Sequence, residues 1–384
     1  MTDLDDLREM VRDVLDERAS SEAARAVLDT PHGYDNGLWQ TVAELDLLGL
    51  LVPEDFGGAG AGLAEMSVLL EELGRRTVPL PVVGSAVLAP TALLGGADRT
   101  AAVELLPALV SGQERAAVVM GGAAGQQDPA TWALTWSERG GRRILDGVSG
   151  FVLDAPGADH LVVVARGPEG LLVCVVDAAA ATITPIAATD QTRRLATVSF
   201  DAVVVPAGRV VALGGEAAAP VARLQSVAAF AMACDALGAA ARATQESAEY
   251  AKVRRQFGRP IGSFQAIKHM CADMAVAVET GRAAVGLALD ELVTGDAPTA
   301  AVSTAKAYVG DAAVRVCTDA VQAHGGIGFT WEHDAHLWLK RALLDRALFG
   351  SSSWHRRRVA DAVLPALSPA PSGSSPAASR NGPG

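Results

Sequence analysis

The first third of the chain carries apolar residues at every third or fourth position, which is the period of an amphipathic helix. This spacing runs through residues 4–15 and again through residues 63–73. The stretch at residues 50–60 is too rich in glycine for regular structure. Three more helices are expected, at residues 38–48, 85–94 and 100–109. The pattern therefore predicts a helical N-terminal region.

From about residue 114 the pattern changes to short β-rich runs separated by Gly, Pro and Asp turns. These runs cover residues 117–120, 132–136, 161–165, 171–176 and 196–205. Several short strands at this spacing indicate a β-barrel or β-sandwich. Its length, roughly a hundred residues, is in the usual range for a small domain.

From about residue 216 the helical period returns in long Ala-rich segments. Four helices are predicted, at residues 221–252, 263–294, 299–323 and 331–349. Long helices with short connections favour an antiparallel four-helix bundle. The predicted fold is α+β, with an N-terminal helical domain (1–112), a middle β domain (113–215), a C-terminal bundle (216–366) and a disordered tail (367–384).

Composition narrows the function classes. The 384 residues are 50% hydrophobic but only 4% aromatic, so small aliphatic side chains must fill the core, and the net charge is −12. This net charge argues against a nucleic-acid binder, which would show basic patches. The acidic N-terminus is unlike a signal peptide, and apolar runs such as 227–233 are too short to span a bilayer. Four scattered cysteines fit free thiols, so we expect a cytoplasmic protein.

One segment concentrates positive charge at the break between the first two bundle helices. Arg254, Arg255 and Arg259 lie in Arg-Arg-Gln-Phe-Gly-Arg-Pro-Ile-Gly-Ser-Phe-Gln, and Ser263 is placed to cap the second helix. Cationic side chains beside a helix N-terminus are suited to a phosphate or pyrophosphate. An ordinary helix hairpin with solvated arginines is the alternative reading.

A second segment, Gln-Ala-His-Gly-Gly-Ile-Gly-Phe at residues 322–329, ends the third bundle helix. Its glycines allow backbone N–H groups to approach a ligand closely, although by themselves they more often mark a helix end. A third segment, Leu-Leu-Val-Pro-Glu-Asp-Phe-Gly-Gly-Ala-Gly at residues 50–60, indicates only a turn.

In this order, the three segments resemble the acyl-CoA dehydrogenase family over nearly the whole chain. The resemblance implies the same three-domain fold and FAD as cofactor. It also implies that the two C-terminal segments hold the ADP half of an FAD bound mainly to a neighbouring subunit. The matching positions are Arg254, Phe257, Gln265, Gln322, Gly325 and Gly326.

The resemblance also exposes a missing residue. Family members remove the proton α to a thioester carbonyl with a Glu, usually in a string such as Ile-Tyr-Glu-Gly-Thr. The matching string here is Leu-Phe-Gly-Ser-Ser, which places Gly350 at the Glu, while a count without gaps reaches Phe349. Members with the Glu on the first bundle helix would have it at about Ala228. No catalytic base is therefore identified in this chain.

The flavin-facing loop of the family, Thr-Glu-Pro-x-x-Gly-Ser-Asp, is also altered. Residues 120–128 keep the loop but lack its Thr, Glu and Ser. The chain thus resembles the base-less subunit of actinobacterial α2β2 acyl-CoA dehydrogenases of the steroid side-chain type. That resemblance implies a homologous partner carrying the catalytic Glu, an acyl-CoA substrate and electron-transfer flavoprotein as acceptor.

Two other readings stay open. A homotetramer could use an unusual base, with Asp345 or Glu332 as candidates, or the chain could bind acyl-CoA without redox chemistry. Glu332, His333 and His336 resemble a metal set, but no fourth ligand is evident, so we interpret them as a polar helix start and predict no metal site.

Overall fold

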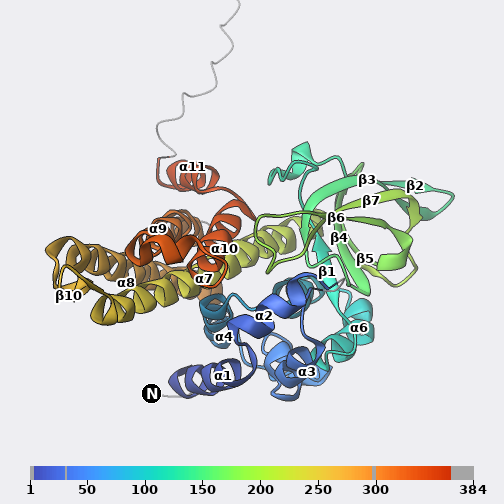
Figure 1. Ribbon diagram of the computed structural model, residues 1–384. Coiled ribbons are helices and arrows are strands. Elements are labelled where there is room, and N and C mark those ends of the chain that lie inside the picture. Colours follow the sequence, from blue (N-terminus) through green and yellow to red (C-terminus); the bar gives the residue numbers. More distant parts are fainter. Residues whose placement is uncertain (1–3, 31–32, 296–299, 365–384) are drawn as a thin grey trace, which may run out of the picture.

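The computed structural model describes residues 4–30, 33–295 and 300–364 (Figure 1). Helices come first, then a β-sheet, then long helices, so the predicted fold class is confirmed. The predicted tail at residues 367–384 lies outside the described residues. The exact domain limits stay predictions.

The N-terminal region is helical, as its apolar period predicts. The predicted helix at 85–94 is in fact a π-helical turn followed by an α-helix, and Pro90 lies at the start of that α-helix. Its elements are α1 (Leu4–Arg18), α2 (Ser21–Leu28), α3 (Asn36–Glu44), η1 (Leu47–Gly49), η2 (Glu54–Phe56), α4 (Leu63–Arg76), η3 (Val83–Leu88), α5 (Ala89–Leu93) and α6 (Thr100–Val110).

The middle region forms an eight-stranded sheet with the order β6-β7-β3-β2-β4-β5-β8, in which β1 pairs with β4. Pairing is mostly antiparallel, but β1 and β4 run parallel. The end strands β6 and β8 have no pairing with each other in the described chain, so a closed barrel is not formed. The strands are β1 (Ala116–Val119), β2 (Thr135–Arg139), β3 (Arg142–Leu153), β4 (His160–Gly167), β5 (Gly170–Asp177), β6 (Thr182–Ile186), β7 (Leu195–Val204) and β8 (Val210–Gly214).

The C-terminal region contains the four predicted bundle helices, α7 (Gly215–Val253), α8 (Gln265–Thr294), α9 (Ala300–His324) and α10 (Ala335–Ala347). A fifth helix, α11 (Ser352–Val363), was missed because its sequence is mostly polar. Its local signal is Ser351, whose hydroxyl accepts a hydrogen bond from Trp354 N–H as an N-cap. The predicted cap of α8 is wrong, because the Ser263 hydroxyl donates to Pro260 O instead.

The central helix of the molecule is α7. It is the one described helix long and apolar enough to cross a bilayer, but 94% of its most apolar stretch is buried inside the protein. Its alanines pack against both the N-terminal helices and the other bundle helices within one continuous core. The apolar composition of α7 is therefore explained by its central position.

Two glycines let α4 and α7 cross in direct backbone contact. A β-carbon on Gly74 would overlap the carbonyl oxygen of Asp235, and one on Gly238 would overlap the carbonyl oxygen of Glu71. Glycine is required here by the close approach of two helices and not by a special backbone angle. This crossing fixes the N-terminal helices on the bundle.

Replacing Gly238 by alanine is expected to lower the free energy of unfolding by about 1–3 kcal/mol, because the added methyl group must push the two helices apart. The shift in the thermal unfolding midpoint measures this loss. Gly286→Ala on α8 is the matched control, because nothing lies within 4 Å of its β-carbon position. That change is expected to raise stability slightly through helix propensity. Equal midpoints for the two variants would contradict the crossing argument.

A buried ion network joins the three regions. Arg341 on α10 pairs with both carboxylate oxygens of Asp235 on α7, at 2.8 and 3.1 Å. Its guanidinium also donates to Val78 O of the N-terminal region and to Thr192 in the loop before β7. Arg193 of that loop lies 2.8 Å from Asp235. The loop is one wall of the cavity described below, so the network holds that wall on the bundle.

Candidate functional site

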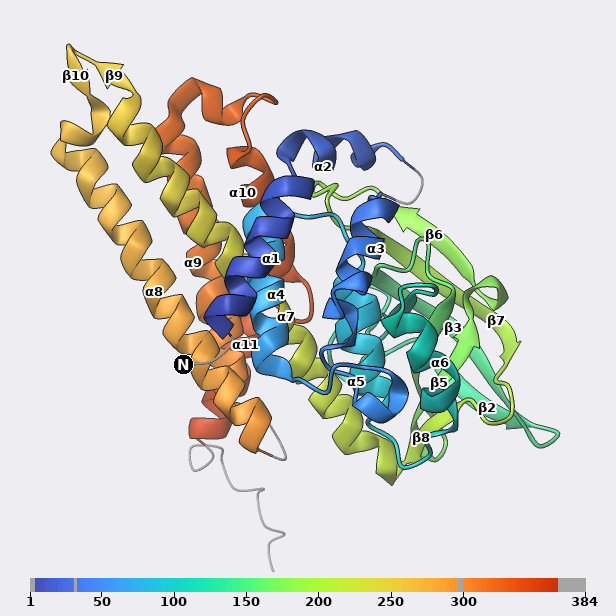
Figure 2. The ribbon, with the colours of Figure 1, turned by 90° about the horizontal axis from the view of Figure 1, so that it is seen from below.

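The two C-terminal sequence motifs meet at one end of the bundle, here called the bundle tip (residues 250–265 and 322–331). The first forms the hairpin of β9 (Arg255–Gln256) and β10 (Arg259–Pro260) between α7 and α8 (Figure 2). The second forms η7 (Gly325–Phe329) directly after α9. The rings of Tyr250 and His324 lie 4.5 Å apart and connect the two segments.

The predicted ligand-binding side chains of the bundle tip are free to meet a ligand. Arg254, Gln265 and Gln322 are all exposed. Gln265 lies 3.4 Å from His269. Within the described residues, the side chains of Arg254 and Gln322 make no hydrogen bond or ion pair with the protein. A guanidinium and an amide without protein partners are suited to an anionic, hydrogen-bonding group.

The backbone of η7 is also open. Gly325 has φ +64°, and no atom lies within 4 Å of a β-carbon position at either Gly325 or Gly326. At Gly325 the positive φ by itself favours glycine, whereas neither packing nor a positive φ requires glycine at Gly326. A ligand that approaches the backbone N–H groups would require it, because a side chain would fill the space.

Phe257 is the most unusual residue of the hairpin. Its side chain is 90% exposed and its φ is +50°, an uncommon value for a residue other than glycine. The ring meets Phe264 edge-on at 6.0 Å, and the guanidinium of Arg259 lies over the Phe264 ring at 4.2 Å. An exposed aromatic ring in a strained conformation indicates a surface that meets a ligand or another chain.

A separate cavity of about 620 Å³ lies between the sheet and the turn from α10 to α11. One wall contains the altered loop, from Met120 to Gln127, together with Phe151 of β3. The turn from α10 to α11 contributes Phe349 and Gly350, and the loop before β7 contributes Ala188 and Thr189. The structure thus brings together the two places where the sequence departs from the family strings. Trp354 of α11 also lines this cavity.

The backbone at the Phe349–Gly350 turn is restrictive. Gly350 has φ +105°, and a β-carbon there would lie 2.7 Å from both the His355 ring and the Trp354 ring. Phe349 has φ +54°. Gly350 therefore has no room for a carboxylate side chain in this conformation.

Two buried side chains that were not predicted from the sequence hydrogen-bond to the backbone of this turn. Lys306 of α9 donates to Asp345 O, Arg346 O and Gly350 O at 2.7, 3.1 and 3.1 Å. Burial lowers the pKa of Lys306 to about 8. His355 Nε2 donates to Phe349 O at 3.0 Å, because that carbonyl can only accept. Burial, followed by the charge of Lys306, lowers the pKa of His355 to about 4, so its ring is neutral near pH 7.

None of the described residues that line the cavity is Asp or Glu. On α7, the residues near it are Gln225, Ser226 and Ala229, which border an adjoining pocket with Phe349 and Trp354. Ala228 is fully buried and borders neither space. Gln225 Nε2 donates to Gln127 O at 2.7 Å and ties α7 to the altered loop.

The alternative bases are not placed for catalysis in this cavity. Asp345 is fully buried in the ion network, where Arg193 Nε lies 3.2 Å from its carboxylate. Burial and the negative charge of Asp235 raise the pKa of Asp345 well above its usual range. Burial alone would also raise the pKa of Asp235, but Arg193 and Arg341 outweigh it and hold that pKa well below its usual value. Glu332 is exposed between η7 and α10 and does not line the cavity.

The histidines around the start of α10, which the sequence analysis considered as metal ligands, lie among aromatic rings. No group of three His, Cys, Asp or Glu residues within the described ranges is arranged to hold an ion. His336 is stacked on Trp331 at 4.9 Å, and His333 lies 4.3 Å from His324. These histidines are parts of an aromatic cluster at the bundle tip.

Comparison with known proteins establishes the class. Residues 2–113 match the model of the acyl-CoA dehydrogenase N-terminal domain, and residues 223–364 match that of the acyl-CoA dehydrogenase C-terminal domain. The chain belongs to the acyl-CoA dehydrogenase family. Members of this family are FAD-dependent oxidoreductases, so the predicted cofactor class is confirmed.

Individual relatives place the chain more closely. It is 36% identical to the acyl-CoA dehydrogenase IpdE2 of Mycolicibacterium smegmatis, over 92% of this chain and 96% of that protein. Among solved structures it is similar to the Tcur3481-Tcur3483 steroid ACAD, with TM-score 0.86 and 30% identity over 94% of this chain and 98% of that one. It is also similar to the ChsE4-ChsE5 complex from Mycobacterium tuberculosis, with TM-score 0.86 and 28% identity over 96% and 99% of the two chains. Steroid-type relatives thus include chains found in heteromeric complexes.

Proposed function

We propose that this chain is the base-less subunit of a heteromeric acyl-CoA dehydrogenase. In this assembly the bundle tip binds the ADP half of an FAD whose flavin ring lies in a homologous partner subunit. That partner supplies the catalytic Glu. The observation that carries the proposal is the contrast between an open, intact bundle tip and a cavity without any carboxylate.

The residues of the bundle tip fit an ADP group. Arg254 offers two N–H groups in one plane to a pyrophosphate, and the amides of Gln322 and Gln265 can hydrogen-bond to sugar or base. The open glycines Gly325 and Gly326 let backbone N–H groups approach the phosphates. The bound FAD would supply hydride acceptance, while these residues bind and orient it.

The chain's own cavity lacks what the reaction needs. An α-proton next to a thioester carbonyl is removed only by a placed base, and the cavity walls offer none. Of the two registers for the family string, the backbone favours the one without a gap. Gly350 then matches the family glycine, as its φ of +105° requires, and Phe349 occupies the position of the Glu. A phenyl ring in place of a carboxylate cannot act as a base.

The substrate proposed for the assembly is an acyl-CoA thioester with a steroid side chain, and its electrons are proposed to pass to an electron-transfer flavoprotein. The support is the similarity to IpdE2 and to a solved steroid ACAD. The apolar cavity walls, with the aromatic rings of Phe151, Phe349 and Trp354, suit a bulky apolar ligand better than a charged one.

The proposal is tested by expressing the chain alone and together with a Glu-bearing acyl-CoA dehydrogenase homologue from the same genome. The lone chain is expected to purify without flavin absorbance, because its loop at residues 120–128 lacks the Thr, Glu and Ser of the family's flavin-facing loop. The pair is expected to purify yellow, with one FAD for each partner chain, and to oxidise an acyl-CoA. A lone chain that carries FAD and oxidises an acyl-CoA would overturn the proposal and favour a homotetramer with an unusual base. Absence of flavin from every co-expression would instead favour a non-redox acyl-CoA-binding protein.

A further inference from the structure

The short helix α2 connects two separate parts of the molecule. It lies on the surface near α10 (Figure 2), and its N-terminal half contacts the segment between η7 and α10. Its C-terminal end contacts the loop before β7. Of its eight residues, Ala24 and Leu28 are the two that are buried. Little apolar surface therefore holds this helix in place, and the polar contacts at its two ends position it.

The first of these contacts is made by Arg25. Its Nη2 lies 2.7 Å from Asp334 Oδ1, and the hydroxyl of Ser21 donates a hydrogen bond to the same oxygen. The guanidinium of Arg25 also lies over the ring of Trp331, 5.8 Å from its centre. Both partners of Arg25 come shortly after η7 in the chain, so α2 contacts the segment that follows the glycine motif. We call Ser21, Arg25, Trp331 and Asp334 the α2 latch.

The carboxylate of Asp334 is used in an unusual way. Asp334 is the N-cap residue of α10, where an aspartate ordinarily accepts hydrogen bonds from the first N–H groups of its own helix. Here it makes no side-chain cap bond and has helical φ and ψ, −82° and −10°. His333 Nδ1 accepts the hydrogen bond of Ala335 N–H instead, at 3.1 Å. The carboxylate is therefore committed to α2 and not to the start of α10.

The glycine motif has few contacts of its own. Gly328 is the one buried residue of η7, and the β-carbon positions of Gly325 and Gly326 touch nothing. On its N-terminal side η7 follows His324, whose ring lies 4.3 Å from that of His333. On its C-terminal side it is followed by the α2 latch. The position of the backbone N–H groups of η7 therefore depends on how these two flanks are held.

The other end of α2 is attached to a rigid part of the molecule. Arg194 Nη2 donates to the carbonyl oxygens of Leu28 and Thr30, the second at 3.2 Å. The last carbonyls of a helix have no partner within the helix, and a cation there is favourable. Arg194 comes directly after Arg193 of the buried ion network and before Leu195, which lines the cavity. α2 thus connects the glycine motif to a loop that the network fixes.

We propose that the α2 latch fixes η7 in the conformation that binds FAD, and that Arg25 is its positioning residue. Arg25 does not touch the cofactor in this proposal. It acts through Asp334 and Trp331, so that the backbone N–H groups of Gly325 and Gly326 are already in place when the phosphates arrive. A site that is ordered in advance loses less entropy on binding. This inference rests on the proposed function, because that function assigns the phosphates of FAD to η7.

The test is Arg25→Ala in the chain co-expressed with a Glu-bearing homologue. We expect FAD binding to weaken about three- to tenfold, because an ion pair and a cation–π contact of this exposure are both modest. FAD release on dilution, followed by flavin fluorescence, measures this change. Hydrogen exchange of the N–H groups in residues 325–334 should become faster, because their flank is no longer held. Arg25→Lys keeps the charge opposite Asp334 and should restore FAD affinity to within about twofold of wild type.

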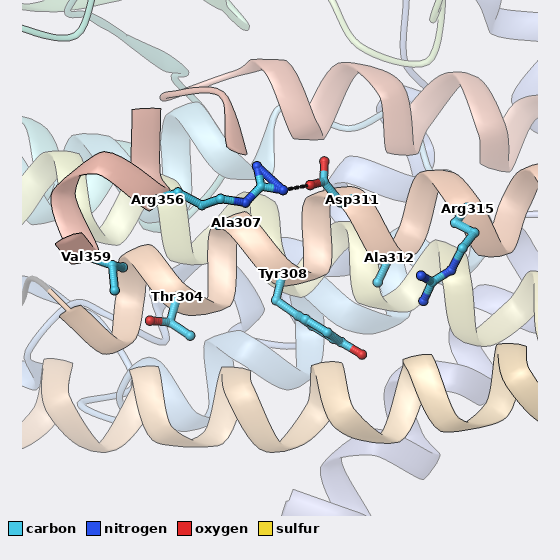
Figure 3. A pocket seen from close by; sticks show the side chains of 8 residues that line it. All are labelled: Thr304, Ala307, Tyr308, Asp311, Ala312, Arg315, Arg356 and Val359. Atoms are coloured by element: carbon cyan, nitrogen blue, oxygen red, sulfur yellow. Dashed lines mark hydrogen bonds and ion pairs between the residues drawn. The ribbon is translucent and has the colours of Figure 1, made fainter. Parts of the chain in front are cut away.

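Two other interhelical or interstrand ion pairs provide matched controls. The Arg209 side chain is 15% exposed, against 20% for Arg25, and it pairs with Glu104 and Asp177 away from the bundle tip. Arg356 of α11 pairs with Asp311 of α9 within the same bundle (Figure 3). Arg209→Ala and Arg356→Ala should leave both FAD affinity and the exchange of residues 325–334 at the wild-type level.

Wild-type FAD release and wild-type exchange in Arg25→Ala would overturn the latch and leave the flavin proposal standing. The latch would also be overturned if the two control variants weakened FAD binding as strongly, or if Arg25→Lys gave no recovery. If the wild-type complex carries no FAD, the proposed function fails. Faster exchange of residues 325–334 in Arg25→Ala would then still support the α2 latch, and unchanged exchange would overturn it too.

Discussion

Asp235→Ala is expected to lower the free energy of unfolding by about 3–5 kcal/mol, because it leaves two buried arginines without their shared counter-ion. Arg193 and Arg341 both pair with this carboxylate, and all three side chains are 2% exposed. Chemical denaturation followed by circular dichroism measures the loss. Glu249→Ala is the control, since its pair with Lys252 is exposed and worth at most about 1 kcal/mol.

Replacing each of the two buried Asp residues of this network by Asn should affect the stability of the protein differently. Burial and the charge of Asp235 raise the pKa of Asp345 well above its usual range, which favours the neutral carboxyl, so we expect Asp345→Asn to be tolerated. Asp235 is ionised, so Asp235→Asn removes a charge that two arginines require. We expect Asp235→Asn to lower the free energy of unfolding strongly and Asp345→Asn to lower it little. Equal losses from the two would contradict this assignment of charge.

Arg254→Gln in the co-expressed complex is expected to weaken FAD binding by about 10- to 100-fold, because a charge-assisted hydrogen bond contributes about 1.5–3 kcal/mol. The glutamine keeps a donor but loses the positive charge that a pyrophosphate needs. FAD release on dilution, followed by flavin fluorescence, measures the effect.

Arg255→Gln provides the matched control for Arg254, because Arg255 is the adjacent exposed arginine and is not among the positions that match the family's FAD-binding residues. It should leave FAD affinity within about threefold of wild type, the ordinary range for a surface change. If Arg255→Gln weakened FAD binding as strongly as Arg254→Gln, the effect would be general electrostatic attraction. The assignment of Arg254 would then be wrong.

The amphipathic periods of the sequence predicted most helices because burial of a helix face requires a local, regular pattern. α11 was missed because its packing depends on single residues, such as Ser352 bonding to Asp311, and not on an apolar stripe. The eight-stranded sheet was incompletely predicted for a similar reason. β6 has few buried side chains, so it carries little alternating pattern.

The sequence likewise predicted some residues of the candidate site and missed others. Arg254, Gln322 and the glycines of η7 could be proposed from sequence, because each motif is continuous and carries its own chemistry. Lys306 and His355 could not, because they hold the Phe349–Gly350 turn through contacts 44 and 6 residues away along the chain. The spacing of a buried lysine on a helix does not reveal which carbonyl groups it will meet.

The sequence by itself determined the class of this protein, the strings that match the family's FAD-binding motifs and the absence of a Glu at the positions that match the usual base. These properties reside in short strings of residues whose chemistry is local. The tertiary structure decided that Gly350 has no space for a side chain and that Asp345 is a member of a buried ion network. Those properties depend on distances between segments far apart in the chain, which only the packed fold sets.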